Sequence, residues 1–201
     1  MYRLVEGQGL VLASASPRRR EFLQRLGIAF QPAAARVDES LWPGEDALAG
    51  AQRLALAKAQ ALAPTWPGAA VLAADTLVTL GPEILGKPQS LEQARQMLEL
   101  LSGQEHQVVT GYCLLEGQRQ DAGLAVSRVR FRQLTSSEIE AYLASGEPLG
   151  KAGAYAVQGL GAALVDGVRG SYTNVVGLPL ARVVELMLGL GIIDPLTEMG
   201  T

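Results

Sequence analysis

Short apolar runs alternate along this chain with segments in which apolar residues recur at helical spacing. Residues 10–14 and 69–78 are apolar runs of strand length, and residues 46–62 carry alanine and leucine at the spacing of a helix face. This alternation is typical of an α/β protein, in which helices cover a sheet. The run at 10–14 leads into Ser16 and Pro17, which favour the start of a helix that stops at Gly27.

Further signals along the chain extend this pattern. A capping-box sequence at Ser90 predicts a helix, residues 106–132 predict two or three strands around a turn at Glu116-Gly117, and Thr135 predicts another helix start. Pro179 precedes a final amphipathic helix that ends near Gly189. Between them lies a glycine-rich segment, residues 146–177, which is long enough that we expect it to shape a site.

Composition excludes several classes of protein. The chain has 201 residues with a net charge of −3, one cysteine and one histidine. A single cysteine, Cys113, excludes an internal disulfide, and together with the single histidine, His106, it is too few for a Cys/His zinc cluster. Both residues are interpreted as structural. The acidic balance disfavours nucleic acid as a partner. The apolar runs are too short to cross a membrane, and no secretory signal is predicted, so we expect a cytoplasmic protein without membrane association.

The serine loop before the first helix is a candidate anion site. Ser14 and Ser16 lie between a strand and a helix start, where backbone N–H groups and the helix dipole favour negative charge. Arg18 and Arg19 in the first helical turn oppose the dipole, which is reasonable if phosphate oxygens neutralise them. The alternative is an ordinary solvated basic turn.

Lysines and acids mark further candidate positions. The only lysines are Lys58, Lys87 and Lys151. Lys58 projects from the apolar face of its predicted helix, either as a lysine whose stem packs while its head reaches water or as a cation in a cleft. Asp75 interrupts a buried strand, so it must be paired, protonated or bound to metal. Glu39 could supply another oxygen ligand, or belong to a solvated acidic loop.

Three arginines alternate with apolar residues at Arg128, Arg130 and Arg132. This spacing places them on one face of a strand, where they could contact nucleic acid. We interpret them instead as a solvated strand face, because few aromatic residues accompany them and the chain is acidic.

Taken together, these segments resemble the Maf family of nucleoside triphosphate pyrophosphatases. The matching stretches run in order over nearly the whole chain: 12–19 (LASASPRR), 37–40 (VDES), Arg53-Leu54 with Lys58, 74–78 (ADTLV), 86–88 (GKP), 101–103 (LSG), Val109-Thr110, 150–159 (GKAGAYAVQG) and 171–179 (SYTNVVGLP). Each stretch alone is weak evidence, but their number and order make the resemblance specific.

The resemblance implies one domain over residues 1–201, with a mixed, elongated β-sheet flanked by helices and two lobes around a deep cleft, as in the Maf/ITPase-like fold. It implies hydrolysis of a nucleoside triphosphate to the monophosphate and pyrophosphate, with Mg²⁺ or Mn²⁺ as cofactor. Asp75 matches the catalytic proton acceptor, and Asp75 with Glu39 is expected to bind the metal. The expected substrate-binding residues are Ser14, Arg18, Arg19, Lys58, Thr76, Lys87 and Gln158. A homodimer is possible in this family.

The stretches around Gln158 and Asn174 resemble the branch that hydrolyses dTTP and UTP. The amide of Gln158 offers both a donor and an acceptor, which suits the edge of a uracil or thymine ring. Two alternatives stay open: a pyrophosphatase for 7-methyl-GTP or non-canonical purine triphosphates, and a nucleotide-binding regulator of cell division without turnover.

Overall fold

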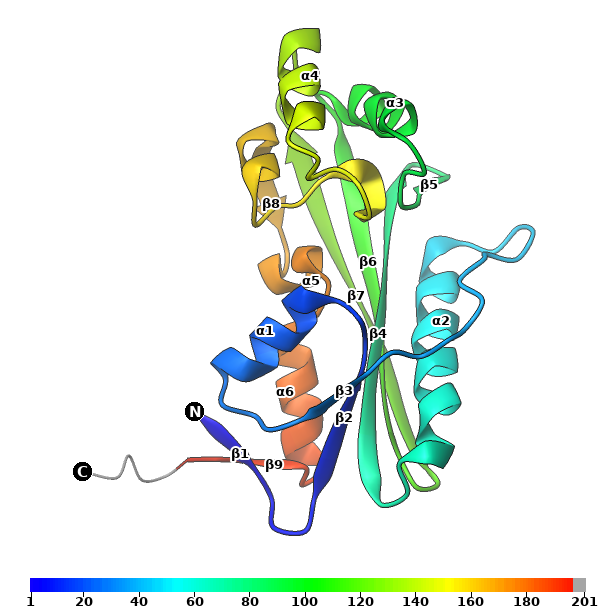
Figure 1. The fold of residues 1–201 in the computed structure, drawn as a ribbon, viewed down its shortest axis with the longest axis vertical. Coiled ribbons are helices and arrows are strands. Elements are labelled where there is room, and N and C mark those ends of the chain that lie inside the picture. Colours follow the sequence, from blue (N-terminus) through cyan, green and yellow to red (C-terminus); the bar gives the residue numbers. More distant parts are fainter. Residues whose placement is uncertain (197–201) are drawn as a thin grey trace.

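A computed structural model describes residues 1–196 and contains a seven-stranded mixed sheet (Figure 1). Along the sheet the strands follow the order β3 (Gln31–Ala33), β2 (Gly9–Ala13), β4 (Ala69–Leu80), β6 (Glu105–Glu116), β7 (Arg119–Phe131) and β8 (Val165–Arg169), with β5 (Glu83–Leu85) also paired to β4. Strand β2 is parallel to β3 and β4, whereas β4, β6, β7 and β8 run antiparallel to one another. A separate pair joins β1 (Tyr2–Leu4) to β9 (Ile193–Pro195).

Helices flank the long central strands on both sides (Figure 1). The helices are α1 (Pro17–Arg25), α2 (Ala47–Leu62), α3 (Leu91–Leu101), α4 (Ser136–Ala144), α5 (Tyr172–Val176) and α6 (Leu180–Gly189), with short 3-10 turns at Ala63–Thr65, Ala152–Ala154 and Leu160–Leu164. Helix α2 lies alone along one face, while α1 and α6 cover the other face near the termini (Figure 1). The predicted α/β class is therefore confirmed.

Strand β4 is apolar over most of its length because both of its faces are buried. Val71 and Ala73 pack against Ala55 and Ala59 of α2, whereas the alternate residue Leu72 packs in the core beneath α1 and α6. Side chains of successive strand residues thus meet different helices, and this alternation continues to Asp75 and Thr76.

Small residues let α2 approach the sheet closely. Gly111 of β6 lies directly beside Asp75 in the register of β4 and β6. A Cβ atom at Gly111 would lie 2.3 Å from the carbonyl oxygen of Ala51, closer than real contacts allow. The absence of a side chain at Gly111 therefore sets the distance between α2 and the strand that carries Asp75.

One edge of β4 has a gap that defines where a site can form. Strand β2 pairs with β4 only as far as Ala73, and β5 pairs with it from Val78 onward. Within the described part of the chain, no strand occupies this edge at residues 74–77. Ligands commonly bind where a parallel strand ends and the chain turns into a helix, as it does here between β2 and α1.

Most predicted elements are confirmed, with differences at their ends. Thr135 forms the complete predicted capping box, whereas Ser90 caps Gln93 while the Gln93 side chain accepts from Gln89 instead. Ser16 occupies the N-cap position of α1 without a capping side-chain bond. A short strand was expected just before Lys87 and is present as β5, whereas β1, β3, β8 and β9 were not predicted, because three to five residues carry little periodicity. None of the described helices is long and apolar enough to span a bilayer.

Candidate active site

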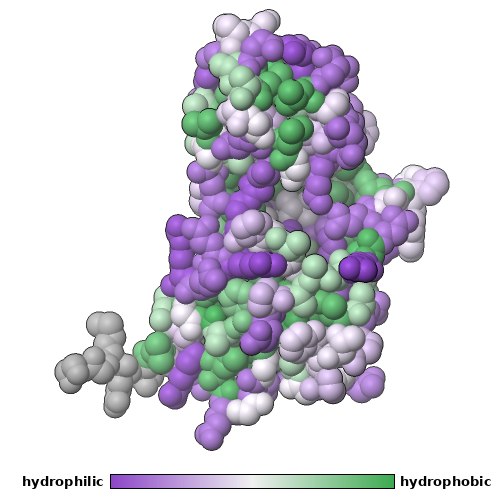
Figure 2. Space-filling view, viewed as in Figure 1, coloured by the Kyte–Doolittle hydropathy of each residue, from purple (hydrophilic) through white to green (hydrophobic). Residues whose placement is uncertain are grey.

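A cavity of about 670 Å³ opens at the gap in β4, and the glycine-rich segment forms part of its wall. In space-filling view, hydrophilic residues flank a hollow at the middle of the molecule (Figure 2). Every residue predicted for the site lines this cavity: Ser14, Arg18, Arg19, Glu39, Lys58, Asp75, Thr76, Lys87 and Gln158. The structure thus brings all of these residues together around one cavity.

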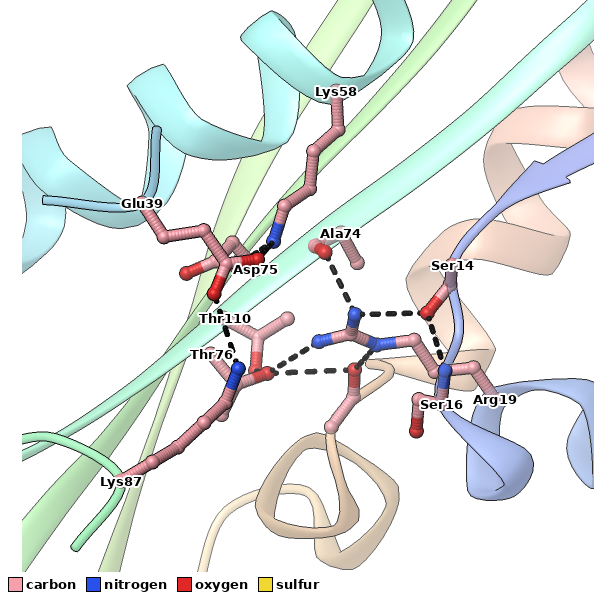
Figure 3. Close-up of polar contacts among 11 residues, drawn as sticks. Ser14, Ser16, Arg19, Glu39, Lys58, Ala74, Asp75, Thr76, Lys87 and Thr110 are labelled. Atoms are coloured by element: carbon pink, nitrogen blue, oxygen red, sulfur yellow. Dashed lines mark hydrogen bonds and ion pairs between the residues drawn. The ribbon is translucent and has the colours of Figure 1, made fainter. Parts of the chain in front are cut away.

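Lys58 and Asp75 both line the cavity and form a buried ion pair (Figure 3). The side chain of Lys58 extends from α2, and its Nζ donates to Asp75 Oδ1. Only 7% of Lys58 and 8% of Asp75 is exposed. Of the interpretations open for these residues, the structure therefore selects a lysine that faces a cleft and a carboxylate that is paired.

Glu39 joins this pair to Lys87 from an irregular loop. Its two carboxylate oxygens lie 2.6 Å from the Nζ of Lys58 and 3.0 Å from the Nζ of Lys87. Partial burial raises the pKa of Glu39, but hydrogen bonds and charge from Lys58 and Lys87 outweigh it and bring the pKa to about 2. Glu39 is therefore ionised at neutral pH, and although it lies on an exposed loop its carboxylate pairs with both Lys58 and Lys87.

Arg19 occupies the other side of β4 and is held by neutral oxygen atoms (Figure 3). Its Nε donates to the carbonyl of Gly177 (2.6 Å), Nη1 to the carbonyl of Ala74 (2.8 Å) and to Ser14 Oγ (3.2 Å), and Nη2 to Thr76 Oγ1 (3.0 Å). A guanidinium has five N–H donors, so one is left. Bidentate binding of phosphate needs two free N–H donors, and Arg19 has only one, because the other four donate to protein oxygen atoms.

Arg18 differs from its neighbour. Its guanidinium lines the cavity, is partly buried and makes no hydrogen bond within residues 1–196. Burial lowers the pKa of Arg18, and the nearby charge of Glu147 opposes this effect. Since its fork is free, Arg18 can receive a ligand, whereas the adjacent Ser16 N–H already donates to Ser14 Oγ at 3.1 Å.

Gln158 lies in the part of the cavity wall that the glycine-rich segment forms. It is exposed, and it follows a turn in which Gly153 and Ala154 both have positive φ, 68° and 59°. The Gly153 N–H donates to the carbonyl of Gly86 at 3.1 Å, which ties this segment to the turn that carries Lys87. A non-glycine residue at positive φ is uncommon and marks a backbone shaped for a site.

Sequence reasoning missed two cavity-lining residues with clear contacts, Glu147 and Tyr155. Tyr155 Oη lies 2.8 Å from Nε2 of His106, and burial lowers the pKa of His106 to about 4. His106 and Cys113 are both buried in the sheet, which confirms their structural interpretation. Tyr155 lies in the matching stretch 150–159, whereas only the glycine-rich composition of residues 146–177 pointed toward Glu147.

The acids of the cavity suit a hard divalent cation. Glu39 and Asp75 bring two carboxylates to one ammonium group, and no group of three histidine, cysteine or acidic side chains forms a metal site among residues 1–196. Magnesium is commonly held by one or two carboxylates, with water and substrate phosphates as its other ligands. The residues present therefore fit Mg²⁺ or Mn²⁺ and do not fit a metal such as zinc that prefers nitrogen and sulfur.

Comparisons with known proteins place this fold and site in a family. The profile of the family described as Maf-like protein matches residues 9–190. The chain belongs to the Maf-like protein family.

The Arg128 to Arg132 stripe takes no part in the cavity; its arginines lie near acids such as Glu105 and Asp166, in keeping with a solvated face.

Curated relatives cover nearly the whole chain. Three of them carry the name dTTP/UTP pyrophosphatase: that of Myxococcus xanthus is 54% identical, that of Moorella thermoacetica 51% and that of Symbiobacterium thermophilum 45%. The matches cover 91%, 91% and 92% of this chain and 93%, 95% and 95% of the relatives. A solved structure, the Ham1 protein of Staphylococcus aureus, matches 61% of this chain and 71% of its own at 16% identity and a TM-score of 0.46, too low to add to the fold described above.

Proposed function

We propose that this protein is a nucleoside triphosphate pyrophosphatase that converts dTTP and UTP to the monophosphate and pyrophosphate. One observation carries the proposal: a single cavity of about 670 Å³ is lined by a buried carboxylate, Asp75, by the cations Arg18, Lys58 and Lys87, and by the amide of Gln158. Relatives of about 50% identity that carry this activity in their names support it.

The cations of the cavity suit a triphosphate chain. Lys58, Lys87 and Arg18 all line the cavity, so their positive charges face one shared space. Lys87 is more than half exposed, so its ammonium can turn from Glu39 toward an arriving phosphate oxygen. The free fork of Arg18 matches phosphate or base oxygens in two-point contacts.

Asp75 is the residue suited to accept a proton. In the proposed reaction a water oxygen attacks the α-phosphorus, the bond from that phosphorus to the bridging oxygen breaks, and pyrophosphate leaves with the bonding electron pair. The water proton passes to the Asp75 carboxylate, whose orientation is fixed by Lys58. Lys58, Lys87 and the partly buried wall stabilise the negative charge that develops on the phosphates.

A divalent cation would be held by Glu39 and Asp75. When bound, Mg²⁺ or Mn²⁺ would neutralise phosphate charge and polarise the phosphoryl oxygens. Gln158 would read the base, because its amide can both donate to and accept from the polar edge of uracil or thymine.

A substrate panel tests the proposal. Pyrophosphate release is measured for dTTP, UTP, CTP, GTP, ITP and 7-methyl-GTP, each with Mg²⁺, with Mn²⁺ and with EDTA. The expected result is fastest release from dTTP and UTP, with loss in EDTA. Preference for ITP or 7-methyl-GTP would replace the proposed substrates, and nucleotide binding without any release would indicate a regulator instead of an enzyme.

A further inference from the structure

Two side chains near the end of α4 hold the backbone of the segment that carries Gln158. Tyr142 lies on α4 and is 5% exposed, and Glu147 follows three residues after the helix. Together we call them the Tyr142–Glu147 pair, and we call residues 156–161 the Gln158 loop. The reaction scheme above uses neither member of the pair.

The pair contacts both ends of the Gln158 loop. Tyr142 Oη accepts the N–H of Ala156 at 3.1 Å and donates its own proton to Glu147 Oε1 at 2.8 Å. The same carboxylate accepts the N–H of Gly161 at 2.9 Å and, through Oε2, that of Leu160 at 3.0 Å. One hydroxyl and one carboxylate therefore fix the backbone on both sides of Gln158.

The loop has glycine where the pair requires it. A Cβ atom at Gly159 would lie 1.9 Å from Glu147 Oε2, and one at Gly161 would lie 2.7 Å from Tyr142 Oη. Neither glycine has a φ in the left-handed region, so close approach, not backbone conformation, explains them. The glycines and the pair form one fitted unit.

The Gln158 side chain itself has no such support. It makes no hydrogen bond to another residue in the part of the chain that the structure describes, and it is exposed to the cavity. Its direction therefore depends on the backbone anchors on either side. A reading group needs such anchors, because a small displacement of a positioned group costs selectivity.

The charge of Glu147 also acts on the part of the cavity that holds Gln158. Partial burial raises its pKa, but hydrogen bonds from Gly161, Tyr142 and Leu160 outweigh burial and lower the pKa below its ordinary value. The carboxylate is therefore ionised at neutral pH and offsets the positive charges of Arg18 and Lys151, which face it.

We propose that Tyr142 and Glu147 are positioning residues for base selection: by anchoring the Gln158 loop they aim its amide at the pyrimidine edge. This inference rests on the proposed function, since it concerns how the same cavity chooses its base. It assigns the pair no contact with the substrate.

The test compares Glu147→Gln and Tyr142→Phe with the wild type and with Glu140→Gln, a control that changes an exposed carboxylate of α4 outside the cavity. Values of kcat and KM are measured for UTP and CTP. In both variants we expect the ratio of kcat/KM for UTP over CTP to fall about tenfold, mainly through a higher KM for UTP. The control keeps the wild-type ratio.

A second measurement follows the anchors directly. Hydrogen exchange at the amides of Leu160 and Gly161 should accelerate in Glu147→Gln and stay unchanged in Glu140→Gln. Glutamine has one acceptor oxygen, and its amide nitrogen would face a backbone donor. If Glu147→Gln fails to fold, Tyr142→Phe decides the question, because it keeps the buried ring and removes only the hydroxyl.

The outcomes separate the inference from the function on which it rests. An unchanged UTP:CTP ratio in the folded variants overturns the positioning role, and so does a Gln158→Ala variant that keeps the wild-type ratio. Absence of pyrophosphate release by the wild type from every triphosphate overturns the proposed function instead.

Discussion

Two buried cations meet β4 from opposite faces, and their partners differ in kind (Figure 3). Lys58 comes from α2 and pairs with the carboxylates of Asp75 and Glu39. Arg19 comes from α1 and donates to carbonyl and hydroxyl oxygens, among them those of Ala74 and Thr76. Asp75 and Thr76 are neighbours on one strand, so their side chains point to opposite faces. Asp75 therefore joins an ionic network on one face, and Thr76 joins a neutral network on the other.

Under the proposed function the Lys58 face does the chemistry, whereas the Arg19 face holds the fold. Lysines paired with carboxylates can pair instead with phosphate oxygens, which carry the same sign of charge. The ion pairs around Lys58 can therefore rearrange when substrate arrives. The carbonyl of Ala74 lies in the gap between β2 and β5, where Arg19 satisfies it in place of a neighbouring strand. Arg19 therefore fastens α1 to the open edge of β4 and has little freedom to bind substrate.

The largest expected effect belongs to the Lys58 face. Asp75→Asn keeps the shape of the side chain but removes the group that accepts a proton, so we expect kcat to fall about 10³-fold while nucleotide binding largely survives. Pyrophosphate release and calorimetric binding of UTP measure the two quantities.

Asp121→Asn is the matched control, because Asp121 lies on β7 outside the cavity and pairs only with Arg119 among the described residues. Turnover by Asp75→Asn equal to that of this control would contradict the chemical role of the Lys58 face.

The next effect concerns the neighbouring arginines. Arg19→Lys keeps the charge but cannot supply the same set of hydrogen bonds, so we expect the free energy of unfolding to fall by about 3 kcal/mol. Arg18→Lys should change it by less than about 0.5 kcal/mol, since Arg18 makes no hydrogen bond among the described residues. Urea denaturation at pH 7 measures the free energy of unfolding of both variants. Equal decreases would contradict the distinction between Arg19, which holds the fold, and Arg18, which is free to bind a ligand.

Sequence reasoning could predict the Lys58 face because its parts lie on long, regular elements. The apolar run that ends at Asp75 indicates a buried strand, and helical spacing places Lys58 on the inner face of α2. The sequence left open whether Asp75 was paired, protonated or bound to metal, and only the structure shows that its partner is Lys58. Thr76, Lys87 and Gln158 were expected in the cavity because of the family resemblance, not because of their spacing.

The roles of Arg19 and Glu147 could not be predicted in the same way. The partners of Arg19 include main-chain carbonyls at Ala74 and Gly177, which every residue type supplies and no sequence pattern marks. Glu147 likewise binds backbone N–H groups of a loop that lacks periodicity. Contacts to the backbone depend on where loops lie in space, and composition alone indicates only that such a loop exists.

The third effect tests how close α2 must lie to the Lys58 face. Gly111→Ala introduces a methyl group against the Ala51 carbonyl, so we expect α2 to shift and the free energy of unfolding to fall by about 2 kcal/mol. Turnover should fall as well, because Lys58 moves with α2, while the contacts of Arg19 on the opposite face are unaffected. Gly167→Ala on β8 is the control, since its new methyl meets no atom within 4 Å. Equal unfolding free energies in the two variants would show that α2 tolerates the displacement.

The smallest effect sharpens the ionic side of the comparison. Burial favours protonation of Glu39, and Lys58 and Lys87 oppose it strongly enough to hold its pKa at about 2. Lys87→Met removes one of these cations, and loss of a nearby positive charge favours the protonated carboxyl, so the pKa of Glu39 must rise toward its ordinary value of 4.5.

At pH 3.5 the carboxyl carbon of Glu39 should report a fully ionised group in the wild type and a partly protonated one in Lys87→Met, measured by ¹³C NMR. Lys87→Arg retains the charge and should behave as the wild type. A pKa unchanged by Lys87→Met would mean that Lys58 alone holds Glu39 ionised and that Lys87 lies outside the network that makes this face differ from that of Arg19.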